Sequence, residues 1–317
     1  MRRLLLAACL FILAPSSVHA TEIVAGVHLI RGEFTPGIQP DGNSVIIRGT
    51  DGLIVVDTGR HPIHADLILD FAAAEKLPIR AVINTHWHLD HIGGNRLIRL
   101  QFPEVRIYAS GALAGARKGF LPRYRSQLED SITHTDDLEQ KIMLKAEVDL
   151  IDAGDELMPT DVIAASRALS IAGRELRITL EENSVTAGDL WIHDPSTGVV
   201  IAGDLVTLPA PFLDTACPAR WKSTLDRLAK MDFSLLIPGH GAPMTRQQFA
   251  TYRRSFDSLL ACAASDAKKE TCVSNWITGV ASLTPDENPR FMRGLMDYYV
   301  DLLRSDASEI AKRCGIK

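Results

Sequence analysis

The chain has 317 residues, of which 46% are hydrophobic and 23% are charged, a balance typical of globular proteins that bury a sizeable core. Its 34 basic and 39 acidic residues give a net charge of -5. Because this charge supplies no basic surplus, nucleic acid is excluded as an expected partner.

Residues 1–20 have the three-part layout of a secretory signal: two arginines, an apolar run over residues 4–13, and the small-residue site Val18-His19-Ala20. We place the cleavage after Ala20. The apolar run is shorter than the roughly 20 residues that a bilayer crossing requires, which disfavours a membrane anchor. A lipoprotein cleavage box ahead of Cys9 is a weaker alternative. We therefore expect a periplasmic or secreted protein with no integral membrane segment after signal removal.

Signal removal leaves four cysteines, Cys217, Cys262, Cys272 and Cys314. Disulfides persist in oxidising compartments, and four cysteines allow three pairings. Cys262 and Cys272 are the easiest pair to join because they lie close in sequence, and Cys217 would then pair with Cys314. Four free or buried thiols are the alternative.

Short β-rich runs alternate with amphipathic helices from residue 24 to about residue 241, without an internal repeat. Residues 45–48 and 53–56 flank a turn sequence at 49–52 and are expected to form a hairpin. A helix is expected over residues 64–75, and a buried strand at residues 81–83 then leads into a histidine-rich run. Further strands are expected at residues 176–180, 190–192, 199–201 and 235–237.

Two helical regions lie outside this alternation. Residues 117–148 are charged and helix-prone, and we expect them to form an insertion that lies across the site. From residue 245 onward the pattern is almost wholly helical, with helices expected around residues 247–264 and 290–304. We therefore divide the mature chain into a core of residues 21–245 and a helical C-terminal extension of residues 246–317, which packs against the core or docks a protein partner.

Four of the expected strands end at a polar residue, namely Asp57, His86, Asp204 and His240. The run Thr85-His86-Trp87-His88-Leu89-Asp90-His91 contains three histidines and an aspartate within six residues, His86 among them. Burying so many polar groups without a ligand would be unfavourable. Imidazole and carboxylate ligands together suit zinc, with iron or manganese as less favoured occupants, so the sequence predicts a zinc site.

The pattern His-x-His-x-Asp-His at residues 86–91 resembles that of the metallo-β-lactamase superfamily, over roughly residues 22–245. The resemblance implies an α/β fold, a four-layer αβ/βα sandwich of the metallo-β-lactamase type. It also implies that Asp57 orients the ligands through hydrogen bonds and that Asp90 helps to orient or receive a proton in catalysis. The expected ligands are His86 and His88 for a first metal and Asp90, His91 and His240 for a second, with Asp204 bridging the two.

The chain departs from this pattern in the segment Ser184-Val185-Thr186-Ala187-Gly188-Asp189-Leu190. Val185 stands where the superfamily has a histidine ahead of Thr-x-Gly-Asp, and valine has no lone pair to donate. The first metal would then complete its shell with water, Glu182 or Asn183, and catalytic zinc commonly has only three protein ligands. We therefore expect one or two zinc ions per chain, with the first site the weaker.

The resemblance implies hydrolysis of a small-molecule ester, thioester, lactone or amide, including a lactam, by metal-bound hydroxide. Two alternatives stay open. One is a non-enzymatic metal-binding or accessory protein with a degenerate first site, for which Val185 is the main argument, and the other is redox chemistry at an iron centre. Residues 209–214, with Trp87 and Tyr124, are expected to line the pocket, and the site does not include His61, His64 or His193.

Overall fold

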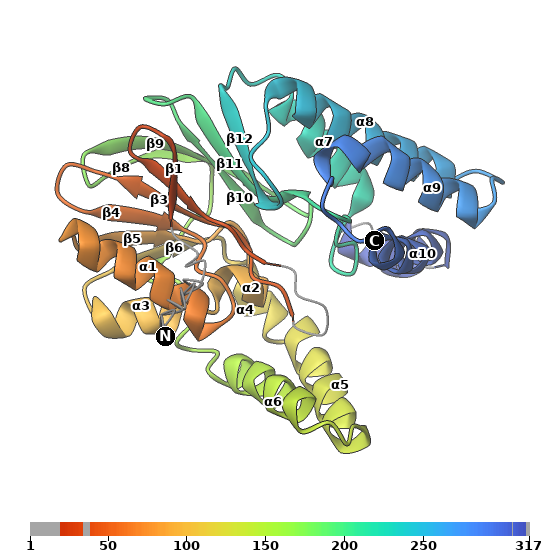
Figure 1. Ribbon diagram of the computed structural model, residues 1–317, viewed down its shortest axis with the longest axis horizontal. Coiled ribbons are helices and arrows are strands. Elements are labelled where there is room, and N and C mark those ends of the chain that lie inside the picture. Colours follow the sequence, from red (N-terminus) through yellow and green to blue (C-terminus); the bar gives the residue numbers. More distant parts are fainter. Residues whose placement is uncertain (1–19, 34–38, 306, 315–317) are drawn as a thin grey trace, which may run out of the picture.

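The computed structural model describes residues 20–33, 39–305 and 307–314. The predicted signal up to residue 19 lies outside the described residues. Two β-sheets are stacked face to face, and helices cover the outer face of each sheet (Figure 1). The predicted four-layer αβ/βα sandwich with a helical C-terminal region is therefore confirmed.

The first sheet has seven strands in sequence order from β1 to β7. Strands β1 to β4 pair antiparallel, and β4 to β7 continue the sheet in parallel. Parallel strands covered on both faces need apolar residues at nearly every position, and all four residues of β4 are buried. The strands are β1 Thr21–Val24, β2 Val27–Ile30, β3 Ser44–Arg48, β4 Leu53–Val56, β5 Ile79–Ile83, β6 Arg106–Ala109 and β7 Asp161–Val162.

The second sheet has five strands in the order β12-β11-β10-β9-β8, and only the β11–β12 pair of this sheet is parallel. The strands are β8 Arg167–Ile171, β9 Arg174–Glu181, β10 Asp189–Asp194, β11 Val199–Thr207 and β12 Leu235–His240. One apolar core fills the space between the two sheets, with Ile54 and Val56 on one side and Ile178 and Ile192 on the other.

One strand continues beyond its predicted end, which places Asp204 inside it, whereas β12 ends at His240 as predicted. The prediction that β11 ends at Asp204 is wrong, because this strand runs on to Thr207 after a register shift at Gly203. Gly203 has a φ of 52°, and a Cβ there would lie 2.5 Å from Thr85 Oγ1, so glycine permits the close approach. Strand β12 includes Pro238, which is tolerated because β12 is the edge strand.

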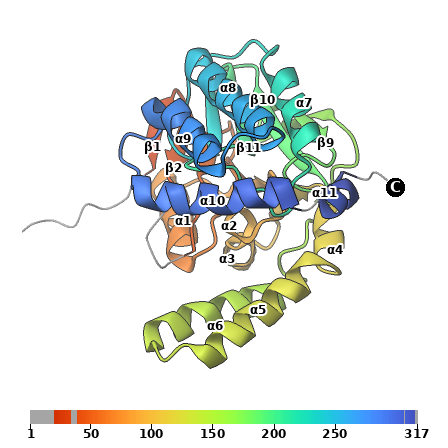
Figure 2. The same ribbon diagram turned by 90° about the vertical axis from the view of Figure 1, so that its right-hand side faces the viewer.

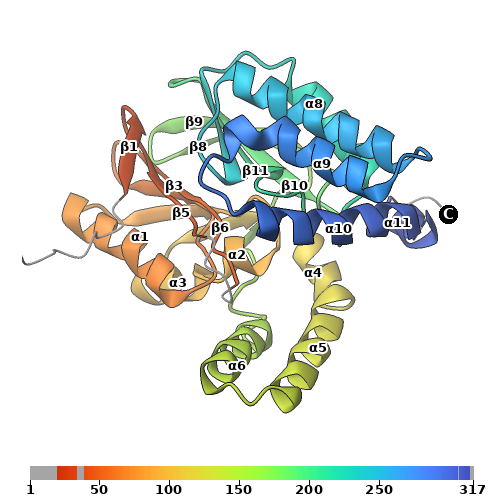
Figure 3. The ribbon, with the colours of Figure 1, turned by 45° about the vertical axis from the view of Figure 1, so that its right-hand side comes forward.

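The predicted insertion is a helical hairpin that projects from the body of the molecule (Figures 1 and 3). Its helices are α5 Phe120–His134 and α6 Leu138–Asp152, and Asp137 caps α6 by accepting hydrogen bonds from Glu139 N and Gln140 N. The other helices of the N-terminal half are α1 Pro62–Glu75, α2 Leu89–Ile92, α3 Asn95–Gln101 and α4 Ala112–Ala116.

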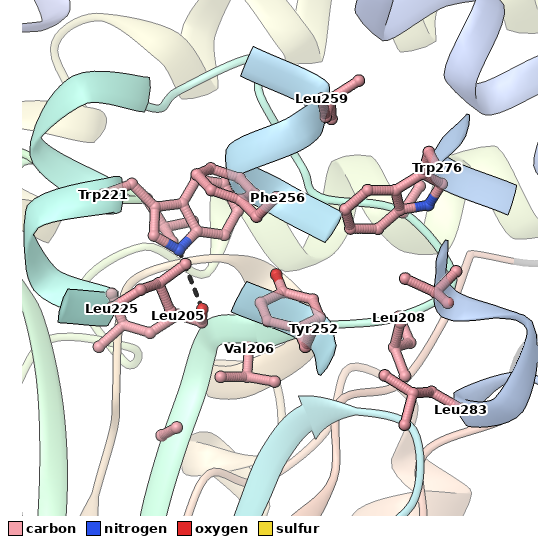
Figure 4. Packing of buried hydrophobic residues seen from close by; sticks show 14 of the residues in the cluster. Leu205, Val206, Leu208, Trp221, Leu225, Tyr252, Phe256, Leu259, Trp276 and Leu283 are labelled. Atoms are coloured by element: carbon pink, nitrogen blue, oxygen red, sulfur yellow. Dashed lines mark hydrogen bonds between the residues drawn. The ribbon is translucent and has the colours of Figure 1, made fainter. Parts of the chain in front are cut away.

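The C-terminal helices complete the core on the outer face of the second sheet. Tyr252, Phe256 and Trp276 pack with Trp221 and the β11 residue Leu205, whose carbonyl accepts a 2.9 Å hydrogen bond from Trp221 Nε1 (Figure 4). The sequence predicted α8 and α10 but missed α9. The helices are α7 Pro218–Leu228, α8 Arg246–Ala263, α9 Lys269–Val280, α10 Pro289–Ser305 and α11 Ala307–Arg313, with a 3-10 turn at Ala281–Leu283.

Two disulfides fasten this helical region, Cys262–Cys272 and Cys217–Cys314. They are the pairing that the sequence spacing favoured, and they exclude the alternative of four free thiols. Within the described residues, no helix combines the length and the apolar character needed to span a bilayer.

Candidate metal centre

Six side chains from three parts of the chain converge at one end of the stacked sheets. His86 and His88 lie in the loop after β5, Asp90 and His91 lie on the short helix α2, and Asp204 and His240 come from β11 and β12. None of the six is more than 8% exposed. These are the six residues that the sequence assigned to the metal site.

Donor atoms from four of these side chains lie close to one another. Asp90 Oδ2 lies 2.9 Å from His240 Nε2 and 3.6 Å from His91 Nε2. Asp204 Oδ1 lies 3.3 Å from His91 Nε2 and 3.6 Å from His240 Nε2. Ligands of a tetrahedral zinc, each 2.0–2.2 Å from the ion, are about 3.3 Å apart. The donor atoms of Asp90, His91 and His240 all lie within 4.8 Å of one another, which suits a zinc ion, and Asp204 approaches two of them.

Two of these atoms, His91 Nε2 and Asp204 Oδ1, are buried and make no hydrogen bond within the described residues. Buried polar atoms in folded proteins nearly always have a partner, because an unsatisfied one is costly. A cation at the centre of the group would satisfy both atoms.

The histidines assigned to the first metal are arranged differently. His86 Nε2 lies 2.8 Å from His88 Nδ1 and 3.8 Å from Asp204 Oδ2. Two groups have all three donor atoms within 4.8 Å of one another, His86–His91–Asp204 and Asp90–His91–His240, and His88 belongs to neither. The first position is thus less complete than the second, and the two oxygens of Asp204 face different histidines.

Asp57 contacts the segment that carries the expected ligands, residues 85–91, through Thr85 and His91. It lies just after β4 with a φ of 59°, an uncommon conformation for a residue other than glycine. Its carboxylate accepts 2.7 Å hydrogen bonds from Thr85 N and Thr85 Oγ1 and lies 2.8 Å from His91 Nδ1. Since Thr85 Oγ1 donates to Asp57, it accepts from His86 Nδ1 at 3.0 Å. Both histidines therefore direct Nε2 into the centre.

Thr215 was not anticipated from the sequence. Its Oγ1 lies 3.0 Å from His88 Nε2 and donates a 2.8 Å hydrogen bond to the carbonyl of Val185. The hydroxyl therefore accepts from His88 Nε2, which leaves Nδ1 as the lone-pair nitrogen that faces His86. Only the position of Thr215 just after the expected pocket segment hinted at this contact.

Arg60 was also missed. Its guanidinium is buried, pairs with Glu147 of α6, and lies 3.4 Å from Asp90 Oδ1. Arg60 Nε also donates a 3.0 Å hydrogen bond to the carbonyl of Pro40. Asp90 thus presents one oxygen to the metal centre and the other to a buried cation.

Opposing charges set the protonation of the centre. Burial favours the neutral form of Asp90, but His91, His240 and Arg60 together hold the pKa of this carboxyl well below its usual range. Burial lowers the pKa of His88 to about 4, with nearby charges adding smaller effects. His91 differs, because Asp204, Asp57 and Asp90 outweigh its burial and raise its pKa well above the usual value. Ionised carboxylates and neutral imidazoles are the forms that bind a metal, so an ion at this centre would replace a proton of His91.

A cavity of about 290 Å³ opens onto these residues. Trp87, Tyr124 and Phe212 line it, as the sequence indicated. His61 lies against Asp41 at 2.8 Å and His64 against Ser44 at 2.8 Å, and neither lines this cavity.

The two substitutes considered for the missing ligand are not at the site. Glu182 is exposed and lines a separate hollow with Arg220, and neither it nor Asn183 is among the described residues around the cavity. The side chain of Val185 is fully buried in the hydrophobic cluster of Trp221 and does not line the cavity either. Only the backbone carbonyl of Val185 reaches the site, through Thr215.

A sequence profile described as the metallo-β-lactamase superfamily matches residues 38–240, a range that contains every residue of the centre. The chain belongs to the metallo-β-lactamase superfamily.

Curated relatives from the superfamily match parts of the chain. A linear primary-alkylsulfatase from Pseudomonas sp. is 27% identical over 227 residues, covering 64% of this chain and 42% of the relative. A hydroxyacylglutathione hydrolase from Synechococcus sp. is 47% identical over 49 residues, covering 16% of this chain and 19% of the relative. The chain thus spans less than half the length of either relative.

Solved superfamily structures share the fold. A metallo-β-lactamase from Pontibacter korlensis has a TM-score of 0.57 at 18% identity and covers 75% of this chain and 98% of its own. A stereoselective inverting sec-alkylsulfatase from Pseudomonas sp. has a TM-score of 0.59 at 19% identity and covers 92% of this chain and 50% of its own. A match over 92% of the chain has to include most of the C-terminal helices, so that fold likeness extends beyond the sandwich.

Proposed function

We propose that this chain is an exported zinc-dependent hydrolase that cleaves an ester-type bond of a small molecule. The observation that supports this most directly is the group of donor atoms from Asp90, His91 and His240 at the end of a cavity, with Asp204 Oδ1 3.3 Å from His91 Nε2. The superfamily scaffold supports many reactions, so the function is argued from this site.

We propose that the two metal positions are unequal. Asp90, His91, Asp204 and His240 would hold one zinc with a full set of four ligands. His86 and His88 would hold a second more weakly, sharing Asp204, because no side chain in the described part of the chain replaces the missing histidine. Bound zinc lowers the pKa of water to about 7 and stabilises negative charge that develops on a substrate oxygen.

Residues of the chain supply the rest of the chemistry. Asp90 is the carboxylate that we expect to orient the attacking water or accept its proton, since it lines the cavity and is held by Arg60. Asp57, Thr85 and Thr215 keep the histidine nitrogens turned toward the centre. Aromatic walls, including Trp87 and Phe212, exclude bulk water around the reacting bond.

The curated relatives narrow the class of bond. The relative that matches the most residues is an alkylsulfatase, and shorter matches are to hydroxyacylglutathione hydrolases. We therefore place sulfate esters, carboxylic esters and thioesters first, ahead of lactones and amides, including lactams.

Export is proposed on two observations. Residues 1–20 have the pattern of a secretory signal, and the four remaining cysteines form two disulfides. Disulfides persist in the periplasm and outside the cell. Fractionation of cells that express the full chain tests this, and recovery in the cytoplasm with an uncleaved N-terminus would contradict it.

The activity is tested with a panel of nitrophenyl carboxylic esters, a nitrophenyl sulfate, a thioester, a lactone and a chromogenic cephalosporin. Wild-type protein is compared with Asp90→Asn and with Asp70→Asn, an exposed position on α1. We expect Asp90→Asn to lower kcat/KM at least about a hundredfold on any substrate found. We also expect a chelator to abolish that activity and added zinc to restore it. Equal trace activity in all three proteins would overturn the hydrolase proposal and favour an accessory metal-binding role.

A further inference from the structure

A second and larger hollow adjoins the cavity of the metal centre. Its volume is about 1010 Å³, and it lies between the α5–α6 hairpin and the N-terminal half of α10. Figure 2 shows α10 crossing this face of the molecule, with the hairpin below it. We call this hollow the outer groove. The lining residues shared by the outer groove and the inner cavity are Gln39, Pro40, Arg60 and Leu295.

Apolar side chains lie on both sides of the outer groove. Ile142, Met143 and Leu144 come from α6, and Phe291 and Leu295 come from successive turns of α10. Ile142 is 60% exposed. Exposed hydrophobic residues that gather along a groove often mark a binding site.

The charges in the groove disfavour an anionic occupant. Both lining arginines are already paired, Arg60 with Glu147 and Asp90 and Arg96 with Glu156. The groove also contains the acidic residues Asp149, Asp286 and Glu287. A negatively charged group would find no unpaired arginine here, whereas an uncharged apolar chain would meet α6 and α10 without desolvating a charge of its own.

The inner cavity is small for a whole substrate. Its volume of about 290 Å³ lies just below the roughly 300–1,000 Å³ that ligand pockets usually occupy. A reactive group and a short chain fill such a space. A longer substrate can continue past Pro40 and Leu295 into the outer groove, because those residues line both spaces.

We infer that the substrate is amphiphilic, with its hydrolysable group at the metal centre and an uncharged apolar chain in the outer groove between α6 and α10. This inference rests on the proposed function for the position of the reactive group. It assigns a role in substrate selection to the helical insertion and the C-terminal extension, which together build the groove.

Chain-length dependence tests this inference. Nitrophenyl acetate, hexanoate and decanoate are compared on wild-type protein, on Met143→Trp in the α6 wall and on Leu295→Trp in the α10 wall. Leu100→Trp is the control, since Leu100 is 79% exposed on α3 and lines neither space. We expect wild-type and Leu100→Trp proteins to prefer decanoate to acetate by about tenfold or more in kcat/KM. We expect the ratio of kcat/KM for decanoate to kcat/KM for acetate to fall toward unity in both groove variants, mainly because the KM for decanoate rises. Equal kcat/KM for the three esters in wild-type protein would overturn the inference and leave the hydrolase proposal intact.

Binding of decanol, with butanol as the short-chain comparison, provides a readout that does not need activity. Calorimetry is expected to detect decanol binding to wild-type and Leu100→Trp proteins, and loss of that binding in both groove variants. If decanol binds in this way but no ester is hydrolysed, the chain-binding role of the outer groove is supported and the proposed hydrolase function is not. Absence of decanol binding to a folded wild-type protein would overturn the inference.

Discussion

His88 and Val185 are joined through a single hydroxyl group. Thr215 Oγ1 lies 3.0 Å from His88 Nε2 and donates a 2.8 Å hydrogen bond to the carbonyl of Val185. Val185, which the sequence pattern places at the superfamily's histidine position, therefore contacts the centre through its backbone, by fixing which nitrogen of His88 has a free lone pair.

Replacing Thr215 by valine keeps the shape of this side chain and removes the hydroxyl. Because outer partners of ligating histidines typically affect metal affinity by 10–100-fold, we expect Thr215→Val to weaken binding of the more labile zinc by about tenfold or more. Competition with a chromophoric chelator measures this affinity. Thr215→Ser retains the hydroxyl and is expected to stay close to wild type, and equal affinities in the serine and valine variants would contradict the role of the hydrogen bond.

Restoring the histidine is not expected to restore a ligand. The side chain of Val185 is fully buried among apolar residues and does not line the cavity. We expect Val185→His to lose about 1–3 kcal/mol of stability, because an imidazole would be buried without a partner, and to bind no additional zinc. Urea unfolding and elemental analysis of the same preparation measure both quantities. A gain of one tightly bound zinc would show that the side chain can turn into the site.

The ion pair between Arg60 and Glu147 ties the projecting hairpin to Asp90. Both side chains are buried, at 10% and 6% exposure. Since Glu147→Gln leaves a buried guanidinium short of one anion, we expect the free energy of unfolding to fall by about 2–4 kcal/mol. Glu156→Gln, which breaks the exposed Arg96 pair, is the matched control and should cost less than about 1 kcal/mol. Similar losses in the two variants would argue against a special role for the buried pair.

The sandwich and the ligands at residues 86–91 could be predicted from the sequence because their signals lie within short segments of the chain. His86, His88, Asp90 and His91 are close together in sequence, so their pattern is visible without knowledge of the fold. The strands were also recognisable, because buried strands are runs of β-branched and aliphatic residues.

Contacts between distant segments could not be predicted in this way. His88 and Thr215 are 127 positions apart, and Arg60 and Glu147 are 87 apart. Neither a threonine in a loop nor an arginine after a turn has a distinctive local pattern. The orientation of Val185 was likewise open, since a substitution in a motif does not reveal whether the new side chain faces the ligand or the core.

Asp41 provides a prediction of pH dependence. Burial opposes ionisation of its carboxyl, but the hydrogen bond with His61 and the charge of His64 outweigh this and lower its pKa. An acid with a lowered pKa in the folded state stabilises the fold above its unfolded pKa, here 3.8, and loses that contribution as the pH falls further. We expect Asp41→Asn to lower the free energy of unfolding of the metal-free protein by about 1–2 kcal/mol near neutral pH. The difference from wild type should shrink as the pH falls below 3.8. Urea unfolding at several pH values measures the difference in unfolding free energy between wild type and Asp41→Asn. A difference that becomes larger at acidic pH would contradict the predicted pH dependence.

The most direct test of the proposed centre is the amount of zinc bound per chain. Elemental analysis after zinc-replete purification and dialysis is compared for wild type and His240→Ala, which removes one of the four proposed ligands. We predict about one retained zinc in wild type, because a four-ligand site binds more tightly than an incomplete one, and close to none in His240→Ala. No zinc in folded wild-type protein, or the same amount in both proteins, would contradict the assignment.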